Sequence, residues 1–512
     1  MAKQSIRSEE AEKFSAYLRT TTKKAGMVFL TKSVALAVSF LVGAIYARIL
    51  GADLYGVFQL AYTTVLTLAI FTVFGTSGGL IRFIPIYKSD ERKDFLKATI
   101  NFAVVFTFTL SVIFALLLIF GNNFIANTIF KEPRLGPILP IFAFILIFFS
   151  LQNVLGGVIQ AEKEAPIFIL YNQIIDRSIS VIVFLGLFYA FYKKLPAISW
   201  AKFVSSFIAL FLIAGWVLRR YPFLLEKPLL PPGNRKKFLS YSSNLLFIRF
   251  TYFLMGQINT LLIGAYSISK EAGFYAIGNI IAGLVVFVLT SFNMIFAPII
   301  SELYHKKEFK TLNEMYSAIT RLIWIFSMPV FLWIIVFSDR ILTIFGPEFA
   351  AAKLVLIFLA IGQFINAAVG PNGLMLSMSG HQKWEMANGI AVAVINLGLN
   401  ILLIPKYGAI GSAAGASVAL AIVNLVKTAE VWHIMKMIPY NAKYIKPAIA
   451  GVIGTGTLLL LKTYLPPSII FTFIAAAIGA GVILLSVLFL GIEEEDKILL
   501  LALKNKLLSL KS

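Results

Sequence analysis

The chain contains no cysteine, and it has three histidines among its 512 residues. The lack of cysteine excludes disulfides, thiolate nucleophiles and cysteine-based metal sites. His305, His381 and His433 are far apart in the sequence and have none of the short spacings that bind a metal ion. The sequence therefore predicts neither a metal centre nor a bound cofactor.

Charged residues are also scarce. They make up 13% of the chain, whereas about a quarter is usual in soluble proteins. Hydrophobic residues make up 59%, which is typical of a polytopic membrane protein. No loop is long enough to hold a soluble catalytic domain, and no phosphate-binding GK[ST] motif occurs. We therefore expect neither an enzyme nor an ATPase.

Acidic residues are much fewer than basic ones, 24 against 45, so the formal net charge is +21. Basic loops resist translocation, and an amino terminus in the cytoplasm places the basic clusters at 88–97 and 219–237 inside. The excess charge is thus explained by topology, and no nucleic-acid partner is expected. The polar first 25 residues contain no cleavable signal. We expect a multi-pass protein of the cytoplasmic membrane with both termini in the cytoplasm.

About fourteen apolar segments are long enough to cross a hydrocarbon layer of about 30 Å. The Gly-Ala turns at 47–61 and 260–280 form a weak internal repeat, and repeated halves commonly enclose a transport site. The predicted fold is all-α, with two six-helix lobes around a central cavity. The expected divisions are a cytoplasmic amphipathic basic arm (1–25), an N-lobe (26–220), a cytoplasmic linker (221–237), a C-lobe (238–440), two further helices (441–490) and a cytoplasmic amphipathic tail (491–512).

Four segments carry a family resemblance: ARILGADLYGVFQLA (47–61), GTSGGLIRFIPIY (75–87), INTLLIGAYSISKEAGFYAIGN (258–279) and NLGLNILLIPKYGAIGSAAGAS (396–417). The sequence resembles the polysaccharide-biosynthesis flippases, the Wzx-like branch of the multidrug/oligosaccharidyl-lipid/polysaccharide exporter superfamily, nearly end to end. The resemblance implies fourteen helices in two MATE-like lobes, alternating access and export of a lipid-linked oligosaccharide. Many relatives have an aspartate where this chain has Asn259, so a proton or ion-pair role at that position is not implied.

Three basic residues lie inside apolar segments and are the main candidates for substrate binding. Arg249 lies close to the middle of 238–263, Lys32 lies in the cytoplasmic third of the first segment, and Arg177 lies near the middle of the fifth. A buried cation is costly unless it faces a wet cavity or a partner. We predict that the three residues point into one central cavity and attract the phosphate groups of the substrate.

Polar residues near these cations are further candidates. Gln173 shares one side of a helix with Arg177, while Asn172 and Asp176 share the neighbouring side. Asn259 follows Arg249 on roughly the same side of its own helix. These four residues are predicted to contact the substrate beside the basic residues.

Three structural alternatives stay open for the charged candidates. Lys32 can extend to the cytoplasmic surface instead of facing the cavity. Asp176 can neutralise an intramembrane cation, with Lys32 or Arg249 as the expected partner. Arg82, near the inner end of the second segment, is either a substrate ligand or a charge that sets topology.

Rival functions also stay open. A cation-coupled multidrug antiporter on the same fold would be expected to carry a carboxylate in its first helix, where this chain has Lys32. A lipid II type flippase is mechanistically close. A membrane-embedded glycosyltransferase or polymerase would need paired acids in its outer loops, where the acids are scattered. The expected partners are the lipid-linked oligosaccharide, membrane lipids and glycan-assembly enzymes, with the protein acting as a monomer.

Overall fold

The computed structural model describes residues 2–191, 193–225 and 235–491, together with Glu493 and Asp496, and these residues include helices and no strand. The side chains of the predicted arm (1–25), most of the linker (226–234) and the tail from 497 onward lie outside the described part. The α-helices of at least five residues are α1 (Ala2–Val73), α2 (Thr76–Ser89), α3 (Lys93–Phe120), α5 (Leu139–Ala161), α6 (Ala165–Ile169), α7 (Asp176–Phe191), α8 (Lys194–Arg220), α9 (Arg235–Met255), α10 (Ile258–Tyr266), α11 (Ser269–His305), α12 (Phe309–Leu342), α13 (Lys353–Ala368), α14 (Asn372–Met378), α15 (Gln382–Met435), α16 (Ile445–Tyr464) and α17 (Ile469–Phe489).

In the described part of the chain, 11 helices are long and apolar enough to cross a membrane, or 12 if the bent pair α9 and α10 is one span. Two of them, α1 and α15, contain a non-helical glycine, Gly51 (φ 81°) and Gly408 (φ 55°). Glycine accepts a positive φ because it has no Cβ. Each of these helices is therefore two helices joined at a kink. The all-α polytopic fold is confirmed, and fourteen crossings stay a prediction.

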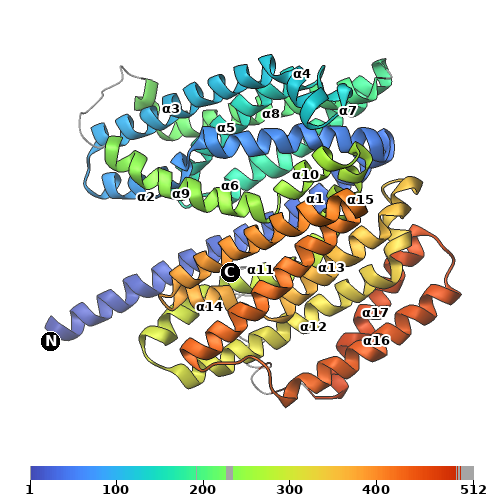
Figure 1. Ribbon diagram of the computed structural model, residues 1–512. Coiled ribbons are helices and arrows are strands. Elements are labelled where there is room, and N and C mark those ends of the chain that lie inside the picture. Colours follow the sequence, from blue (N-terminus) through green and yellow to red (C-terminus); the bar gives the residue numbers. More distant parts are fainter. Residues whose placement is uncertain (1, 192, 226–234, 492, 494–495, 497–512) are drawn as a thin grey trace.

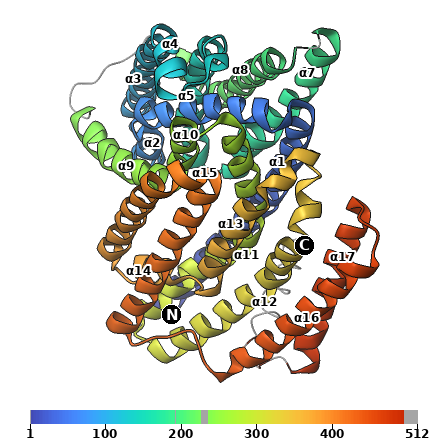
Figure 2. The same cartoon turned by 45° about the vertical axis from the view of Figure 1, so that its right-hand side comes forward.

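The helices gather into two bundles (Figure 1). In both views α2 to α8 form the upper bundle, the N-lobe, and α11 to α15 form the lower bundle, the C-lobe (Figures 1 and 2). The first half of α1 runs along α11, and its second half enters the N-lobe beside α5. The additional pair, α16 and α17, packs against α12 on the outside of the C-lobe. The two-lobe architecture agrees with the expected fold class, whereas the residue boundaries of the divisions stay predictions.

A buried ion pair ties the chain after α17 to the C-lobe. The Arg321 guanidinium on α12 donates hydrogen bonds of 2.8 and 2.6 Å to the two carboxylate oxygens of Asp496, and both side chains are buried. Nearby, the Lys446 ammonium of α16 contacts Glu493 at 2.7 Å. Asp496 and Glu493, two described residues that follow α17, therefore contact α12 and α16 respectively.

The two lobes touch closely where α1 crosses α11. A Cβ atom added to Gly56 would lie 1.7 Å from the carbonyl oxygen of Ser269, and one added to Gly273 would lie 2.4 Å from that of Ala52. Such distances mean that backbone packs directly against backbone, as glycine allows between membrane helices. The crossing lies near the kink at Gly51. We call this end of the molecule, which the topology predicts to face outward, the outer end.

Candidate functional site

Arg249 connects α9 to the N-lobe. Its guanidinium Nη2 donates a 2.8 Å hydrogen bond to the hydroxyl of Ser77, in the first turn of α2. That turn follows a break in the helix at Gly75 (φ 72°), and irregular backbone at membrane depth is tolerated where it is buried or lines a cavity. Although it makes this bond, Arg249 is exposed. The most prominent sequence candidate therefore lies between α9 and α2 and has a neutral partner.

Arg82 lies along the same seam between α2 and α9. Its guanidinium carbon is 4.4 Å from the centre of the Tyr241 ring on α9, a cation–π geometry. In both views α2 and α9 run side by side (Figures 1 and 2). Only Phe238, Ser242 and Phe253 of α9 are buried, so this helix is sparsely packed. The structure thus brings two of the predicted basic residues to one seam, where Arg82 contacts the helix that carries Arg249.

Asp176 has a partner that the sequence did not predict. Its carboxylate accepts a hydrogen bond from the Lys202 ammonium of α8 and another, of 2.9 Å, from the Ser205 hydroxyl. Asp176 is 4% exposed and Lys202 is 8% exposed. The expectation that Asp176 neutralises Lys32 or Arg249 is therefore wrong, because the buried amine on α8 already occupies it. Because both carboxylate oxygens already accept hydrogen bonds from α8, Asp176 is a poor ligand for a substrate.

Arg177 and Lys32 do not form such pairs within the described residues. Arg177 of α7 is half-buried and interacts electrostatically with Tyr46 and Tyr55 of α1. Lys32 is exposed on α1. Lys32, Arg177 and Arg249 lie on three different helices, α1, α7 and α9. A shared cavity for the three cations therefore stays a hypothesis.

Asn259 belongs to a buried amide cluster in the C-lobe. Its Oδ1 accepts hydrogen bonds from Asn396 (2.8 Å) and Asn400 (3.1 Å) of α15, and its Nδ2 donates one of 2.6 Å to the Tyr275 hydroxyl of α11. Asn259 is 1% exposed. Both ends of the amide are engaged, so the prediction that Asn259 contacts the substrate is not supported, and a role in joining α10, α11 and α15 replaces it.

The two amides of the N-lobe differ from each other. Asn172 donates a 2.9 Å hydrogen bond to Gln152 of α5, which in turn donates one of 2.6 Å to the backbone oxygen of Ser206 on α8. Asn172 thus connects neighbouring helices. Gln173 is half-buried, and no hydrogen bond of its side chain is found within the described residues. Contact of Gln173 with a substrate stays a prediction.

Comparison with known proteins identifies the family. A family model described as polysaccharide biosynthesis protein matches residues 21–304, more than half of the chain. The chain belongs to the polysaccharide biosynthesis protein family. The MatE family model also matches residues 245–402. The predicted family is therefore confirmed.

The individual relatives share about a quarter of their residues with this chain. This chain is 24% identical to an uncharacterized membrane protein of Methanocaldococcus jannaschii. The match covers 93% of this chain and 97% of the relative. It is 26% identical to a probable low-salt glycan biosynthesis flippase, Agl15, of Haloferax volcanii, over 49% of this chain and 52% of the relative. A structure of the lipid II flippase MurJ in an inward closed conformation has a TM-score of 0.71 and 16% identity, and the match covers 90% of this chain and 97% of that one. At this identity the structural likeness shows the fold alone.

In this family member, two carboxylates at the outer end contact the kinks of α1 and α15. Glu348, after α12, accepts a 3.1 Å hydrogen bond from the backbone N–H of Ala52, next to the α1 kink. Glu271 of α11 accepts one of 2.6 Å from the N–H of Ala409, next to the α15 kink. Each carboxylate caps the N–H that a helix leaves free after its glycine. These two acids, which the sequence shows as scattered, therefore stabilise the two kinks.

A second group of acids crosses between the lobes at the outer end. Glu132 of the N-lobe accepts a hydrogen bond from the Ser269 hydroxyl at the start of α11, and it also binds the Arg134 guanidinium at 2.7 Å. Arg134 holds Asp53 as well, at 2.9 Å. The hydrogen bonds and charge of Arg134 lower the pKa of Glu132, so that carboxyl stays ionised. Together with the Gly56 crossing, this network joins the two lobes at the outer end.

Proposed function

We propose that this membrane protein is a flippase, which moves the head of a lipid-linked oligosaccharide from the inner to the outer leaflet of the cytoplasmic membrane by alternating access. The observation that carries the proposal is the exposed Arg249 guanidinium, which lies in a membrane span and binds a serine hydroxyl instead of a carboxylate. A cation at that depth is costly unless it faces water or an anion. A phosphate or diphosphate supplies the oxygen atoms that a guanidinium binds best.

The distribution of charge in the N-lobe supports an anionic head group. Asp176 is neutralised by Lys202, so it does not cancel the charge of the adjacent Arg177. Arg82 adds a further cation at the α2–α9 seam. Sugar hydroxyls and phosphates are costly in hydrocarbon, and a wet path lined by cations lowers that cost while the polyprenyl tail stays in the lipid.

The contacts at the outer end support alternating access. The lobes are joined there by Glu132, Glu348 and the Gly56 crossing, and alternating access then requires that the substrate enters from the opposite side. We place that side, with both termini, in the cytoplasm, because basic loops resist translocation. With the cell interior negative, outward movement of an uncompensated anion is favoured by about 2.3 kcal/mol per charge per 100 mV. The protein acts as a monomer that passes its substrate to glycan-assembly enzymes.

Replacing Arg249 with alanine tests the proposal. The substitution removes a charge-assisted hydrogen bond worth about 1.5–3 kcal/mol, so the rate of flipping is expected to fall at least roughly tenfold. The measurement is the transfer of a fluorescent polyprenyl-diphosphate oligosaccharide between the leaflets of proteoliposomes. Arg249→Lys keeps the charge and loses the planar donor pair, so an intermediate rate is expected.

Arg219→Ala is the matched control for that experiment, because Arg219 is an exposed arginine in the last turn of α8. Its rate should equal that of the unmodified protein. Normal flipping by the double variant Arg177→Ala, Arg249→Ala, at normal abundance, would contradict the proposal.

A cation-coupled multidrug antiporter is the second candidate, and the MatE match over residues 245–402 favours it. Against it, Asp176 is paired with Lys202, and an exposed Arg249 repels cationic drugs. Ethidium efflux driven by a proton or sodium gradient separates the two functions, since the flippase is expected to show none. A lipid II type substrate is distinguished in the same proteoliposomes by replacing the oligosaccharide lipid with lipid II.

A further inference from the structure

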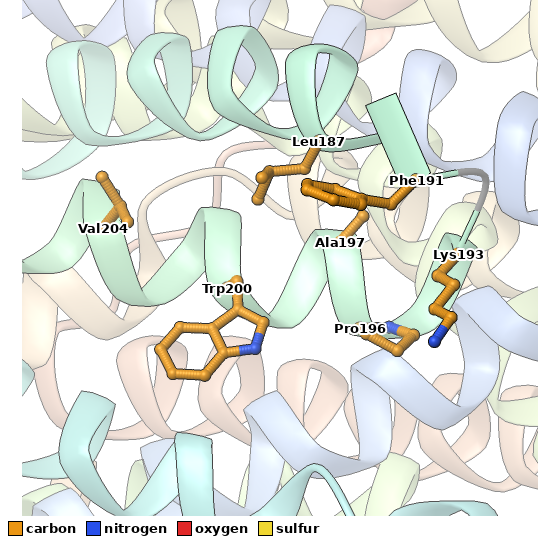
Figure 3. A pocket seen from close by; sticks show the side chains of 7 residues that line it. All are labelled: Leu187, Phe191, Lys193, Pro196, Ala197, Trp200 and Val204. Atoms are coloured by element: carbon orange, nitrogen blue, oxygen red, sulfur yellow. The ribbon is translucent and has the colours of Figure 1, made fainter. Parts of the chain in front are cut away.

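A groove lies on the surface of the N-lobe where α7 ends and α8 begins (Figure 3). Its volume is about 340 Å³. Its walls are Leu187 and Phe191 of α7 together with Lys193, Pro196, Ala197, Trp200 and Val204, which belong to α8 or directly precede it. The last four recur at helical spacing, so they form one stripe along α8 that faces α7.

The groove forms because the small side chain of Ala197 lies between the large rings of Phe191 and Trp200. Ala197 is 5% exposed, and it forms the floor, while Phe191 and Trp200 rise on either side with 67% and 48% of their surface exposed. Figure 3 shows Phe191 lying above Ala197, with Trp200 further along α8. Exposed apolar side chains in a membrane span face lipid. The shape and chemistry of the groove therefore suit a hydrocarbon chain.

One end of the groove is basic and lacks acidic neighbours in the sequence. Lys193 lines that end, with Val204 at the other (Figure 3), and Lys194 is exposed beside it. No aspartate or glutamate occurs between Asp176 and Glu226. Within the described residues neither lysine forms an ion pair with a carboxylate. Two positive charges therefore stand at the mouth of an apolar groove, at the end of both helices.

We propose that this groove is a binding site for an anionic membrane lipid, which places one hydrocarbon chain between Phe191 and Trp200 and its phosphate against Lys193 and Lys194. Neutral lipid tails already solvate the protein, so burying a chain gives little preference for one lipid over another. The preference arises at the head group, because lysines at a membrane surface attract anionic lipids. The site is distinct from the seam between α2 and α9 and does not depend on the transported substrate.

Quenching of Trp200 fluorescence by brominated lipids tests the proposal. Trp216, Trp324, Trp384 and Trp432 are replaced with phenylalanine, while Trp333 is kept because it is buried, with 6% exposure, and bromine atoms do not reach it. The protein is reconstituted with increasing fractions of brominated phosphatidylglycerol in phosphatidylcholine, or of brominated phosphatidylcholine in phosphatidylglycerol. Half-maximal quenching is expected at a roughly fivefold lower fraction of the anionic lipid.

The lysines account for that difference if the proposal is correct. Lys193→Gln, Lys194→Gln should make the two quenching curves coincide, whereas Lys406→Gln, an exposed lysine of α15, should leave the difference intact. The same variants in the chain with all tryptophans retained report the anionic lipid that copurifies, in case the tryptophan replacements prevent folding. Equal quenching by the two lipids, or a preference that survives the double lysine substitution, would overturn the proposal.

Discussion

Lys202→Met is expected to lower the free energy of unfolding by about 3–5 kcal/mol. The substitution leaves the Asp176 carboxylate buried at 4% exposure, with hydroxyl donors but no cation. Removing one partner of a buried ion pair is costly because the remaining charge keeps its desolvation penalty. The change is measured as the loss of thermal and denaturant stability of the purified protein in detergent.

Removing both charges is expected to restore most of that loss. Asp176→Leu, Lys202→Met replaces the pair with apolar side chains, which is often neutral for stability. Lys194→Met, which removes an exposed lysine of the same helix, should change the free energy of unfolding by no more than about 0.5 kcal/mol. If the single variant Lys202→Met is as stable as the unmodified protein, the pair does not hold α7 to α8.

Gly56→Ala is expected to prevent the outer end from closing. The added Cβ would lie 1.7 Å from the Ser269 carbonyl oxygen, and a backbone atom cannot move aside as a flexible side chain can. The lobes must therefore separate at this crossing. A penalty of about 3 kcal/mol shifts the equilibrium toward the outward-open state roughly a hundredfold, and flipping should decline accordingly.

The opening can be followed with a single cysteine at Lys270, which is half-buried beside the crossing, because the natural chain contains none. In Gly56→Ala that cysteine should react faster with a membrane-impermeant thiol reagent added from outside. Gly215→Ala is the control, since a Cβ at Gly215 would have no atom within 4 Å. Unchanged reactivity and unchanged flipping in Gly56→Ala would show that the α1–α11 crossing does not govern access.

The fold could be predicted from the sequence because the bilayer restricts the choices. Long apolar segments must be helices, and the repeated Gly-Ala turns and family motifs indicate two lobes. The α1 kink at Gly51 falls within the turn predicted at 47–61. Gly51 and Gly408 interrupt α1 and α15 without ending them, because a single glycine with positive φ redirects the chain while neighbouring backbone stays helical.

The partners predicted for Asp176, Lys32 or Arg249, were wrong for two physical reasons. Lys202 lies within the first third of α8, where the sequence predicts a residue at the membrane interface. In the structure it is buried against α7. A π-helical turn, Leu170–Ile175, also comes directly before Asp176 and changes the direction in which the following side chains point. Neither the pairing across helices nor the π-turn has a pattern in the sequence that predicts it.

The role of the outer acids also depends on tertiary structure. Glu271 and Glu348 lie in the first turns of helical segments, where carboxylates are common. Each nevertheless contacts a backbone N–H more than a hundred residues away. For Asn259 the position on the helix predicted that the side chain faces a cavity. In the folded chain it is instead hydrogen-bonded to Asn396, Asn400 and Tyr275. A helical face shows that a residue is not facing lipid, but it does not distinguish a cavity from a neighbouring helix.

The account depends most on a wet, cationic path between the lobes, and a cysteine at Gln173, four residues before Arg177, measures it most directly. In inside-out vesicles an anionic methanethiosulfonate should react with Gln173→Cys about tenfold faster than a cationic one of similar size, because a positive cleft concentrates anions. That preference should disappear in the additional variant Arg177→Ala. No reaction from the inner side, or a faster reaction with the cationic reagent, would contradict the account.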